Sequence, residues 1–131
     1  FGFPYSVDLT SGFARYNPGD TSSIDLLVRG EVDAMFTIGS DPGAHFPISA
    51  VKQFAHIPSV CIDPHLTPTS GVSKLHVPVA FNGVEIGGNC YRMDNVPIDC
   101  RKVVEPPEGM LTDEQFLIKV RDRVRQLKGA A

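Results

Sequence analysis

The stretch AMFTIGSDPGAHFP, from Ala34 to Pro47, decides the fold of this 131-residue chain. Residues 34–38 have the composition of a buried strand and run directly into the turn sequence GSDPG at 39–43. Helical spacing follows the turn. A strand, a tight glycine turn and a helix start together form a place where backbone N–H groups can bind an anion. The question is which anion such a turn would bind.

A second strand follows this turn at a distance that suits one helix. Pro47 suits a first helical turn, and Pro58 blocks the helix from continuing. Four apolar residues share one helix face between these prolines: Ala50, Val51, Phe54 and Ala55. Residues 59–62 predict the second strand, which ends at Asp63. The order strand, helix, strand predicts that the two strands are parallel.

Three further segments complete the predicted elements. Ser22 or Ser23 can cap a short helix that stops at Gly30. A third apolar run at 75–80 is broken by Pro78, which places it at a sheet edge or a strand end. Thr112 begins a last helix, with Gln115 as its capping-box partner. Residues 81–109, between them, have the composition of extended chain with loops.

The predicted fold class is α/β, with a Rossmann-like, mostly parallel sheet, flanking helices and an irregular N-terminal arm at residues 1–20. The arm is rich in glycine, proline and aromatic residues and needs another surface to bury its aromatics. An alternative is an α+β domain in which residues 75–80 pair antiparallel. We expect residues 1–131 to form a single domain, and a start at Phe1 suggests a fragment or a part of a larger subunit.

Composition narrows the function classes. The net charge of −3 gives no reason to expect nucleic acid or an anionic membrane as a partner. No apolar run approaches the roughly 20 residues needed to span a bilayer. Three cysteines without a C-x-x-C pair make a disulfide framework unexpected and favour a reducing, cytoplasmic location.

The two strand ends carry the candidate binding residues, because ligands of open parallel sheets bind beyond the carboxyl ends of strands. The first turn lacks G-x-G-x-x-G and G-K-[ST], which disfavours dinucleotide redox cofactors and nucleoside triphosphatases. Gly39 lets a ligand approach the backbone, and Ser40 and His45 can donate to a phosphate. Asp63 stands where an acid accepts from a ribose hydroxyl or a base. A nucleotide-like ligand is the resulting hypothesis.

A structural interpretation competes with each of these assignments. Gly39 and Gly43 are also ordinary turn glycines, and Asp41 before a proline can start a turn through its own side chain. Asp63 can be turn chemistry in the same way, together with Thr67 and Thr69.

The remaining chemistry-bearing residues predict neither a catalytic residue nor a metal ligand. Cys61 lies within a predicted strand with no adjacent positive group, as expected of a core residue and not of a nucleophile. The sequence also lacks the nucleophile-elbow pattern. The four histidines do not have metal-ligand spacing, either among themselves or with Cys90 and Cys100.

The sequence resembles the C-terminal part of the B subunit of formylmethanofuran dehydrogenase, in the molybdopterin oxidoreductase superfamily. The resemblance covers nearly the whole chain and rests on RYNPGD, VDAMFTIGSDPGAHFP, IDPHLTPTS, HVPVAFNGVE, YRMDNVPI and RKVVEPPEG, taken in order. A strand followed by a G-S-[DN]-P turn is shared by the wider superfamily. The resemblance implies a Rossmann-like domain that holds one half of a bis(molybdopterin guanine dinucleotide) cofactor carrying tungsten or molybdenum. The anion of the glycine turn would be the cofactor pyrophosphate.

The resemblance also implies roles for individual residues. Gly39, Ser40 and Asp41 would line the phosphate or guanosine side of the cofactor, and Asp63 would pair with guanine or ribose. His65 and Thr67 would close that pocket. Where relatives read E-G-T before an aromatic residue, this chain reads GGNCY at 87–91, a departure that bears on three further candidates: Gly88, Asn89 and Arg92.

The implied enzyme reduces CO2 to formate at the metal, and a partner subunit condenses the formate with methanofuran. The metal-ligating cysteine or selenocysteine and the iron–sulfur cysteines would belong to an N-terminal part that these 131 residues do not contain. Other subunits of the complex are the implied partners. The alternative is a metal-free relative that serves as a scaffold in a formyltransferase/hydrolase complex of one-carbon metabolism.

Overall fold

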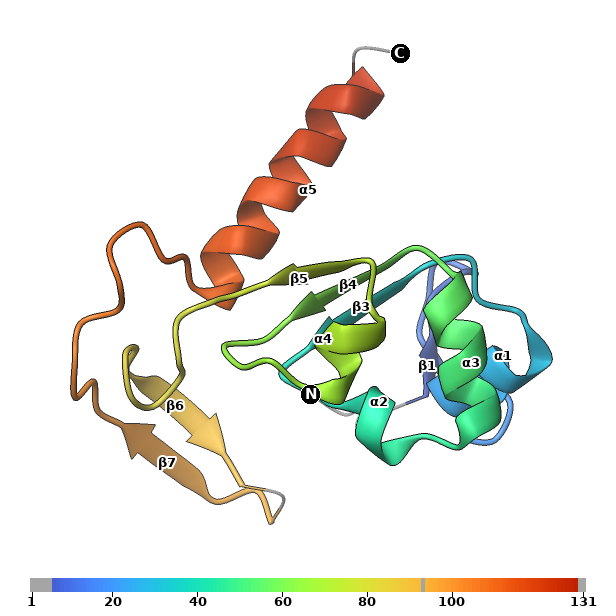
Figure 1. Cartoon of the computed structure of the whole chain (residues 1–131), viewed down its shortest axis with the longest axis horizontal. Helices are drawn as coiled ribbons and strands as arrows, with labels where there is room; N and C mark the ends of the chain where they lie inside the picture. The colour runs from blue at the N-terminus through green and yellow to red at the C-terminus, as the bar shows by residue number, and fades with distance from the viewer. Residues whose placement is uncertain (1–5, 93, 130–131) are drawn as a thin grey trace. The chain divides into compact units, whose positions relative to one another are not determined.

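The structure is a computed structural model that describes residues 6–92 and 94–129 (Figure 1). The chain divides into two compact units. One consists of the residues up to Cys61 together with Leu66–His76, and the other of Ile62–His65 together with the residues from Val77 onward. The expectation that residues 1–131 form one cofactor-binding domain stays a prediction.

A three-stranded parallel sheet organises the fold, in the order β3 (Met35–Ile38), β4 (Ser59–Ile62), β5 (Leu75–Val77). The two strands predicted from the opening stretch are therefore neighbours, and the prediction of a parallel, Rossmann-like α/β fold is confirmed. β5 is an edge strand that stops immediately before Pro78, because proline cannot donate to a strand ladder. The antiparallel α+β alternative is wrong.

Two predicted helices build the main core of the first unit. α1 (Ser23–Arg29) is capped by Ser22, and Gly30 ends it with φ +71°, while the next N–H closes back onto Leu26. α3 (Ile48–His56) packs against α1. The buried core residues of these two helices and the following turn are Leu27, Ala50, Phe54 and Ile57.

The two faces of β3 differ in burial. Met35 packs against the helical core, and Thr37 on the same face is 4% exposed. On the opposite face, Phe36 is 54% and Ile38 is 42% exposed. The sequence predicted a buried strand, but the described residues cover only one face of β3.

Two short helices were not predicted. α2 (Pro42–His45) begins within the predicted glycine turn, and α4 (Pro68–Val72) follows the candidate turn residues after β4. α4 begins with a capping box between Thr67 and Ser70 and has proline at its first position. Helices of four and five residues carry too few periodic positions to show an apolar face in the sequence.

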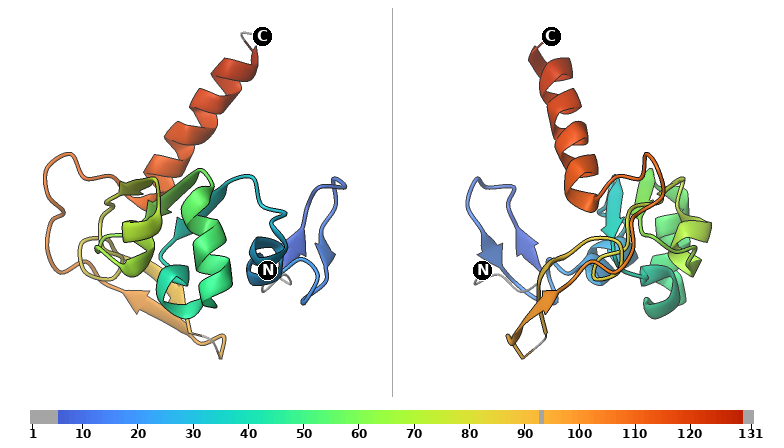
Figure 2. Two further views of the ribbon diagram at one scale, coloured as in Figure 1. Left: turned by 45° about the vertical axis from the view of Figure 1, so that its right-hand side comes forward. Right: turned by 90° about the vertical axis from the view of Figure 1, so that its left-hand side faces the viewer.

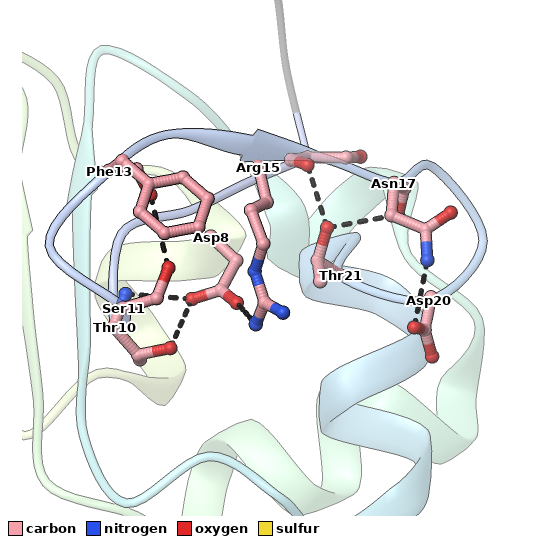
Figure 3. Close-up of polar contacts among 9 residues, drawn as sticks. Asp8, Thr10, Ser11, Phe13, Arg15, Asn17, Asp20 and Thr21 are labelled. Atoms are coloured by element: carbon pink, nitrogen blue, oxygen red, sulfur yellow. Dashed lines mark hydrogen bonds and ion pairs between the residues drawn. The ribbon is translucent and has the colours of Figure 1, made fainter.

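The N-terminal arm contains a hairpin that the irregular-arm prediction did not include. β1 (Val7–Asp8) and β2 (Arg15–Tyr16) are antiparallel, and Asp8 lies opposite Arg15. Asp8 also accepts hydrogen bonds from the N–H and the hydroxyl of Thr10 (Figure 3). The arm aromatics Phe13 and Tyr16 are 63% and 48% exposed, and the other three, Phe1, Phe3 and Tyr5, lie outside the described residues.

The second unit contains another hairpin, β6 (Gly88–Tyr91) with β7 (Pro97–Cys100), in the segment predicted as extended chain and loops (Figure 2). α5 (Asp113–Gly129) has the predicted capping box between Thr112 and Gln115. No residue of α5 is buried. Among the described helices, none combines the length and apolar character that a membrane crossing requires.

Candidate functional site

The turn after β3 has an open backbone at Gly39. Its φ is +54°, in the left-handed region that favours glycine, and a Cβ placed there would meet no atom within 4 Å. Ser40, the next residue, is exposed. An outside group can therefore come close to the main chain at this point, as a phosphate-binding turn requires.

Asp41 connects the same turn to α4. Its Oδ1 accepts a hydrogen bond from the backbone N–H of Thr69 at 3.0 Å and another from the Thr69 hydroxyl at 2.6 Å. Thr69 is 0% exposed. The hydroxyl bond is the main cause that lowers the pKa of Asp41 below its ordinary value, although partial burial opposes the shift. Asp41 is an ionised, half-buried acceptor that connects the turn after β3 to α4.

Gly43 completes this contact from the other side. Its N–H donates to Oγ1 of Thr69 at 2.7 Å. A Cβ on residue 43 would lie 2.6 Å from the backbone nitrogen of Thr69, closer than such atoms approach. Glycine is therefore required here by the close approach of α4. We refer to Asp41, Gly43 and Thr69 as the clamp.

The clamp changes the interpretation of the helix start. Pro42 has no N–H, the N–H of Gly43 is bonded to Thr69, and those of Ala44 and His45 donate to the carbonyl of Asp41 at 3.1 and 3.2 Å. The N–H groups at the start of α2 therefore have partners within the protein, and binding of an anion at the turn stays a prediction. The backbone of Gly39 to Asp41 is the part of the turn that remains for such a contact.

His45 and Thr67 take part in local hydrogen bonds. Nδ1 of the exposed His45 lies 2.7 Å from the carbonyl oxygen of Asp41, so this nitrogen is the ring donor. Thr67 caps α4: its Oγ1 accepts from the N–H of Ser70 at 3.3 Å, and its own N–H donates to Oγ of Ser70 at 2.8 Å. His45 therefore stabilises the segment after β3, and Thr67 stabilises the segment after β4.

Asp63 follows β4 directly and is 8% exposed. Its Oδ1 accepts a hydrogen bond from the N–H of His65 at 2.8 Å, and its own N–H donates to the carbonyl of Val77 at 3.3 Å. The ring of His65 stands edge-on to Phe81, with ring centroids 5.0 Å apart. His65 is therefore one turn partner of Asp63, and the suggested partnership with Thr67 or Thr69 stays a prediction.

The last three candidate residues lie on or beside β6. Gly88 and Asn89 are exposed residues of this strand. Arg92 follows it and pairs with Asp94 at 2.9 Å, with both side chains more than half exposed. An exposed pair of this kind contributes little to stability, so Arg92 can exchange Asp94 for another anion at little cost.

The ten candidates divide between the two units. Gly39, Ser40, Asp41, His45 and Thr67 belong to the first, and Asp63, His65, Gly88, Asn89 and Arg92 to the second. Their assignment to a cofactor stays a prediction. The sequence suggested Thr69 only as a turn partner of Asp63, and its contact with Asp41 was missed. The sequence T-P-T-S at 67–70 nevertheless signals a capped helix start at this point. Within the described ranges, no three His, Cys, Asp or Glu side chains are grouped to hold a metal ion.

Comparison with known proteins identifies relatives over almost the whole chain. It is 52% identical, over 126 residues and 96% of its length, to the B subunit of the tungsten-containing formylmethanofuran dehydrogenase 2 of Methanocaldococcus jannaschii. The chain is homologous to the C-terminal part of the B subunit of formylmethanofuran dehydrogenase. The corresponding B subunit of Methanococcus maripaludis is 50% identical over 97% of the chain. No family model matches the sequence.

The relatives are much longer than this chain. The 131 residues span 29% of the length of each of the two B subunits. The names of both relatives describe a tungsten-containing dehydrogenase and one subunit of a larger assembly. The activity, the cofactor and the partners of formylmethanofuran dehydrogenase are therefore considered for this chain as proposals.

Proposed function

We propose that this chain holds the guanine dinucleotide end of a bis(molybdopterin guanine dinucleotide) cofactor, carrying tungsten or molybdenum, in a formylmethanofuran dehydrogenase. The observation that carries this proposal is the identity of at least 50%, over 96% or more of the chain, to subunits named tungsten-containing formylmethanofuran dehydrogenase. The implied enzyme reduces CO2 to formate, and a partner subunit then forms formylmethanofuran.

The turn after β3 fits a phosphate-bearing group. Gly39 offers open backbone, and the exposed Ser40 adds a hydroxyl. The hydroxyl of Thr37, two residues before Gly39, is buried and has no hydrogen-bond partner among the residues that the structure describes. Burial of an unpaired hydroxyl is costly, which supports a partner group outside these residues. The clamp would keep the turn fixed while such a group binds.

Asp63 suits recognition of guanine. A carboxylate can accept two hydrogen bonds, from the N1–H and the exocyclic amino group of that base, while adenine lacks such a donor pair. The N–H of His65 and the pairing with Val77 fix the position of the acid at the end of β4. Preorganisation of this kind lowers the entropy cost of binding.

When bound, the metal–pterin group would supply the two-electron chemistry that interconverts CO2 and formate. The residues of this chain would bind and orient the nucleotide: the backbone of Gly39 and the hydroxyl of Ser40 at the phosphates, and Asp63 at the base. The proposal places the metal-ligating residue and the iron–sulfur cysteines outside this chain.

The test is the cofactor content of the purified complex that contains this chain. We expect tungsten or molybdenum by elemental analysis, and a pterin guanine dinucleotide by mass spectrometry of the released cofactor, in excess of the metal as the bis form requires. A pure and folded complex without metal and without pterin would contradict the proposal. That result would favour the scaffold role in a formyltransferase/hydrolase complex.

A further inference from the structure

Two cysteines share one face of the β6–β7 hairpin. In its register Cys90 lies opposite Ile98, and Gly88 lies opposite Cys100. Because side chains two residues apart point to the same side of a strand, Cys90 and Cys100 are diagonal neighbours on one face. Glycine at position 88 leaves no side chain directly across from Cys100, so the Cys100 thiol can lie toward Cys90.

The surroundings of the two thiols are also open. Both line a cavity of about 190 Å³ beside Asn82, Ile86 and Asn89. The other lining residues are Gly83, Gly87 and Gly88. A Cβ on residue 83 would lie 3.7 Å from Sγ of Cys100, and one on residue 87 would lie 3.0 Å from the Cys100 carbonyl oxygen. The first distance is an ordinary contact, whereas the second is tight, so glycine at position 87 allows the close approach of the Cys100 backbone.

The two thiols are not equivalent. Cys90 is exposed, whereas Cys100 is half-buried. Hydrogen bonding to Cys90 is the main cause that raises the pKa of Cys100, with partial burial second. Cys100 consequently stays protonated at a pH where an ordinary thiol begins to ionise. The exposed Cys90 is the better placed of the two to react first with a molecule from solution.

We propose that Cys90 and Cys100 form a reversible dithiol/disulfide pair that exchanges with low-molecular-weight disulfides. In the first step the Cys90 thiolate attacks one sulfur of the small disulfide, which forms a mixed disulfide and releases one small thiolate. In the second, Cys100 loses its proton to water and attacks Sγ of Cys90, and the second small thiolate leaves. Two protein thiols are oxidised, and one small disulfide is reduced to two thiols.

The disulfide would fix the open end of the hairpin. The strands pair from Gly88 with Cys100 to Tyr91 with Pro97, so the connecting turn holds only the other end. A hairpin of two four-residue strands is marginally stable by itself. Oxidation would hold the pairing at the Gly88–Cys100 end. The inference does not depend on the proposed cofactor role.

The experiment uses the full-length protein or its native complex, oxidised anaerobically with glutathione disulfide and then alkylated and digested with trypsin without reduction. Trypsin cuts after Lys74, Arg92 and Arg101, so Cys90 and Cys100 fall on separate peptides, 75–92 and 93–101. A disulfide between them appears as a linked peptide pair in mass spectrometry. The 0% exposed Cys61 is the internal control and should stay reduced.

We expect the linked pair to form with oxidised glutathione and to disappear when reduced glutathione is added. In a Cys100→Ser variant the glutathione mixed disulfide at Cys90 should accumulate ~10-fold above wild type, because no resolving thiol remains. A Cys90→Ser variant should lower modification of Cys100 ~10-fold in rate. The proposal is wrong if folded wild-type protein accumulates the mixed disulfide as Cys100→Ser does, or if neither thiol reacts.

Discussion

The same pair of hydrogen bonds occurs in two regions of this protein. In the N-terminal hairpin, Thr10 donates its N–H at 2.8 Å and its hydroxyl at 2.6 Å to Oδ1 of Asp8 (Figure 3). In the clamp, Thr69 donates the same two groups to Oδ1 of Asp41, at 3.0 and 2.6 Å. The first pair joins residues two positions apart, and the second joins residues 28 positions apart.

Burial separates the two pairs. Thr10 is exposed, so water can replace its bonds, and Asp8 also has Arg15 as a partner. Thr69 is 0% exposed and accepts the N–H of Gly43 with the same hydroxyl. Loss of a hydrogen bond costs most when the remaining partner cannot reach water. The two pairs have nearly equal distances, but because of burial we expect the clamp to contribute more to stability than the Thr10 pair.

The largest effect is expected for Gly43→Ala. The new Cβ would lie 2.6 Å from the backbone nitrogen of Thr69, which cannot rotate away. We expect a loss of about 3 kcal/mol in the free energy of unfolding, measured by denaturant titration. Gly71→Ala is the matched control, because residue 71 lies in α4 with no atom within 4 Å of a Cβ, and it should be neutral or slightly stabilising. Equal losses at both positions would rule out the close contact.

The next effect separates the two threonines. Thr69→Val keeps the shape but removes a donor to Asp41 and the acceptor of Gly43, and we expect it to cost about 2 kcal/mol of unfolding free energy. Thr10→Val removes the same chemistry from an exposed turn and should cost at most about 0.5 kcal/mol. Chemical denaturation of both variants measures the difference. Similar costs would show that burial does not distinguish the pairs.

The smallest expected effect is the pH dependence of stability that comes from Asp8. The Thr10 hydroxyl is the main cause that lowers the pKa of Asp8 from 3.8 to about 2, so the stability linked to this shift is present above pH 3.8 and is lost as the pH falls toward 2. Thr10→Val should raise the Asp8 pKa toward its ordinary value, and the small part of the stability above pH 3.8 that is linked to this shift should be lost with it. Carboxyl titration by NMR measures this shift. An Asp8 pKa that does not move would assign the shift to the backbone N–H of residue 10 and to Arg15 instead.

Local signals predicted much of the fold. Ser22 and Gly30 mark the ends of α1, Thr112 and Gln115 mark the start of α5, and the apolar run at 59–62 has the bounds of β4. The first hairpin was missed because its strands have two residues each, and the second because its four-residue strands lack the apolar runs that predicted β3 and β4.

The candidate site also has features that the sequence predicts and features that it does not. The positions of Gly39 and Asp63 at the ends of β3 and β4 follow from strand order, which the sequence predicts. The role of Asp41 depends on Thr69, 28 positions away, and a single sequence carries no signal for that contact. The steric need for glycine at position 43 has the same origin, since the blocking atoms belong to α4.

The most direct test of the central claim is the guanine dinucleotide content of an Asp63→Asn complex. Asparagine retains an oxygen that can accept the N–H of His65, so the turn should persist, while the pairing with guanine loses its charge and one acceptor. Charge-assisted bonds of roughly 1.5 to 3 kcal/mol predict at least ~10-fold weaker retention of the nucleotide. Asp122→Asn, at a half-exposed side chain of α5, is the control and should retain it. Wild-type content in a folded Asp63→Asn complex would contradict the account and leave Asp63 as a turn residue.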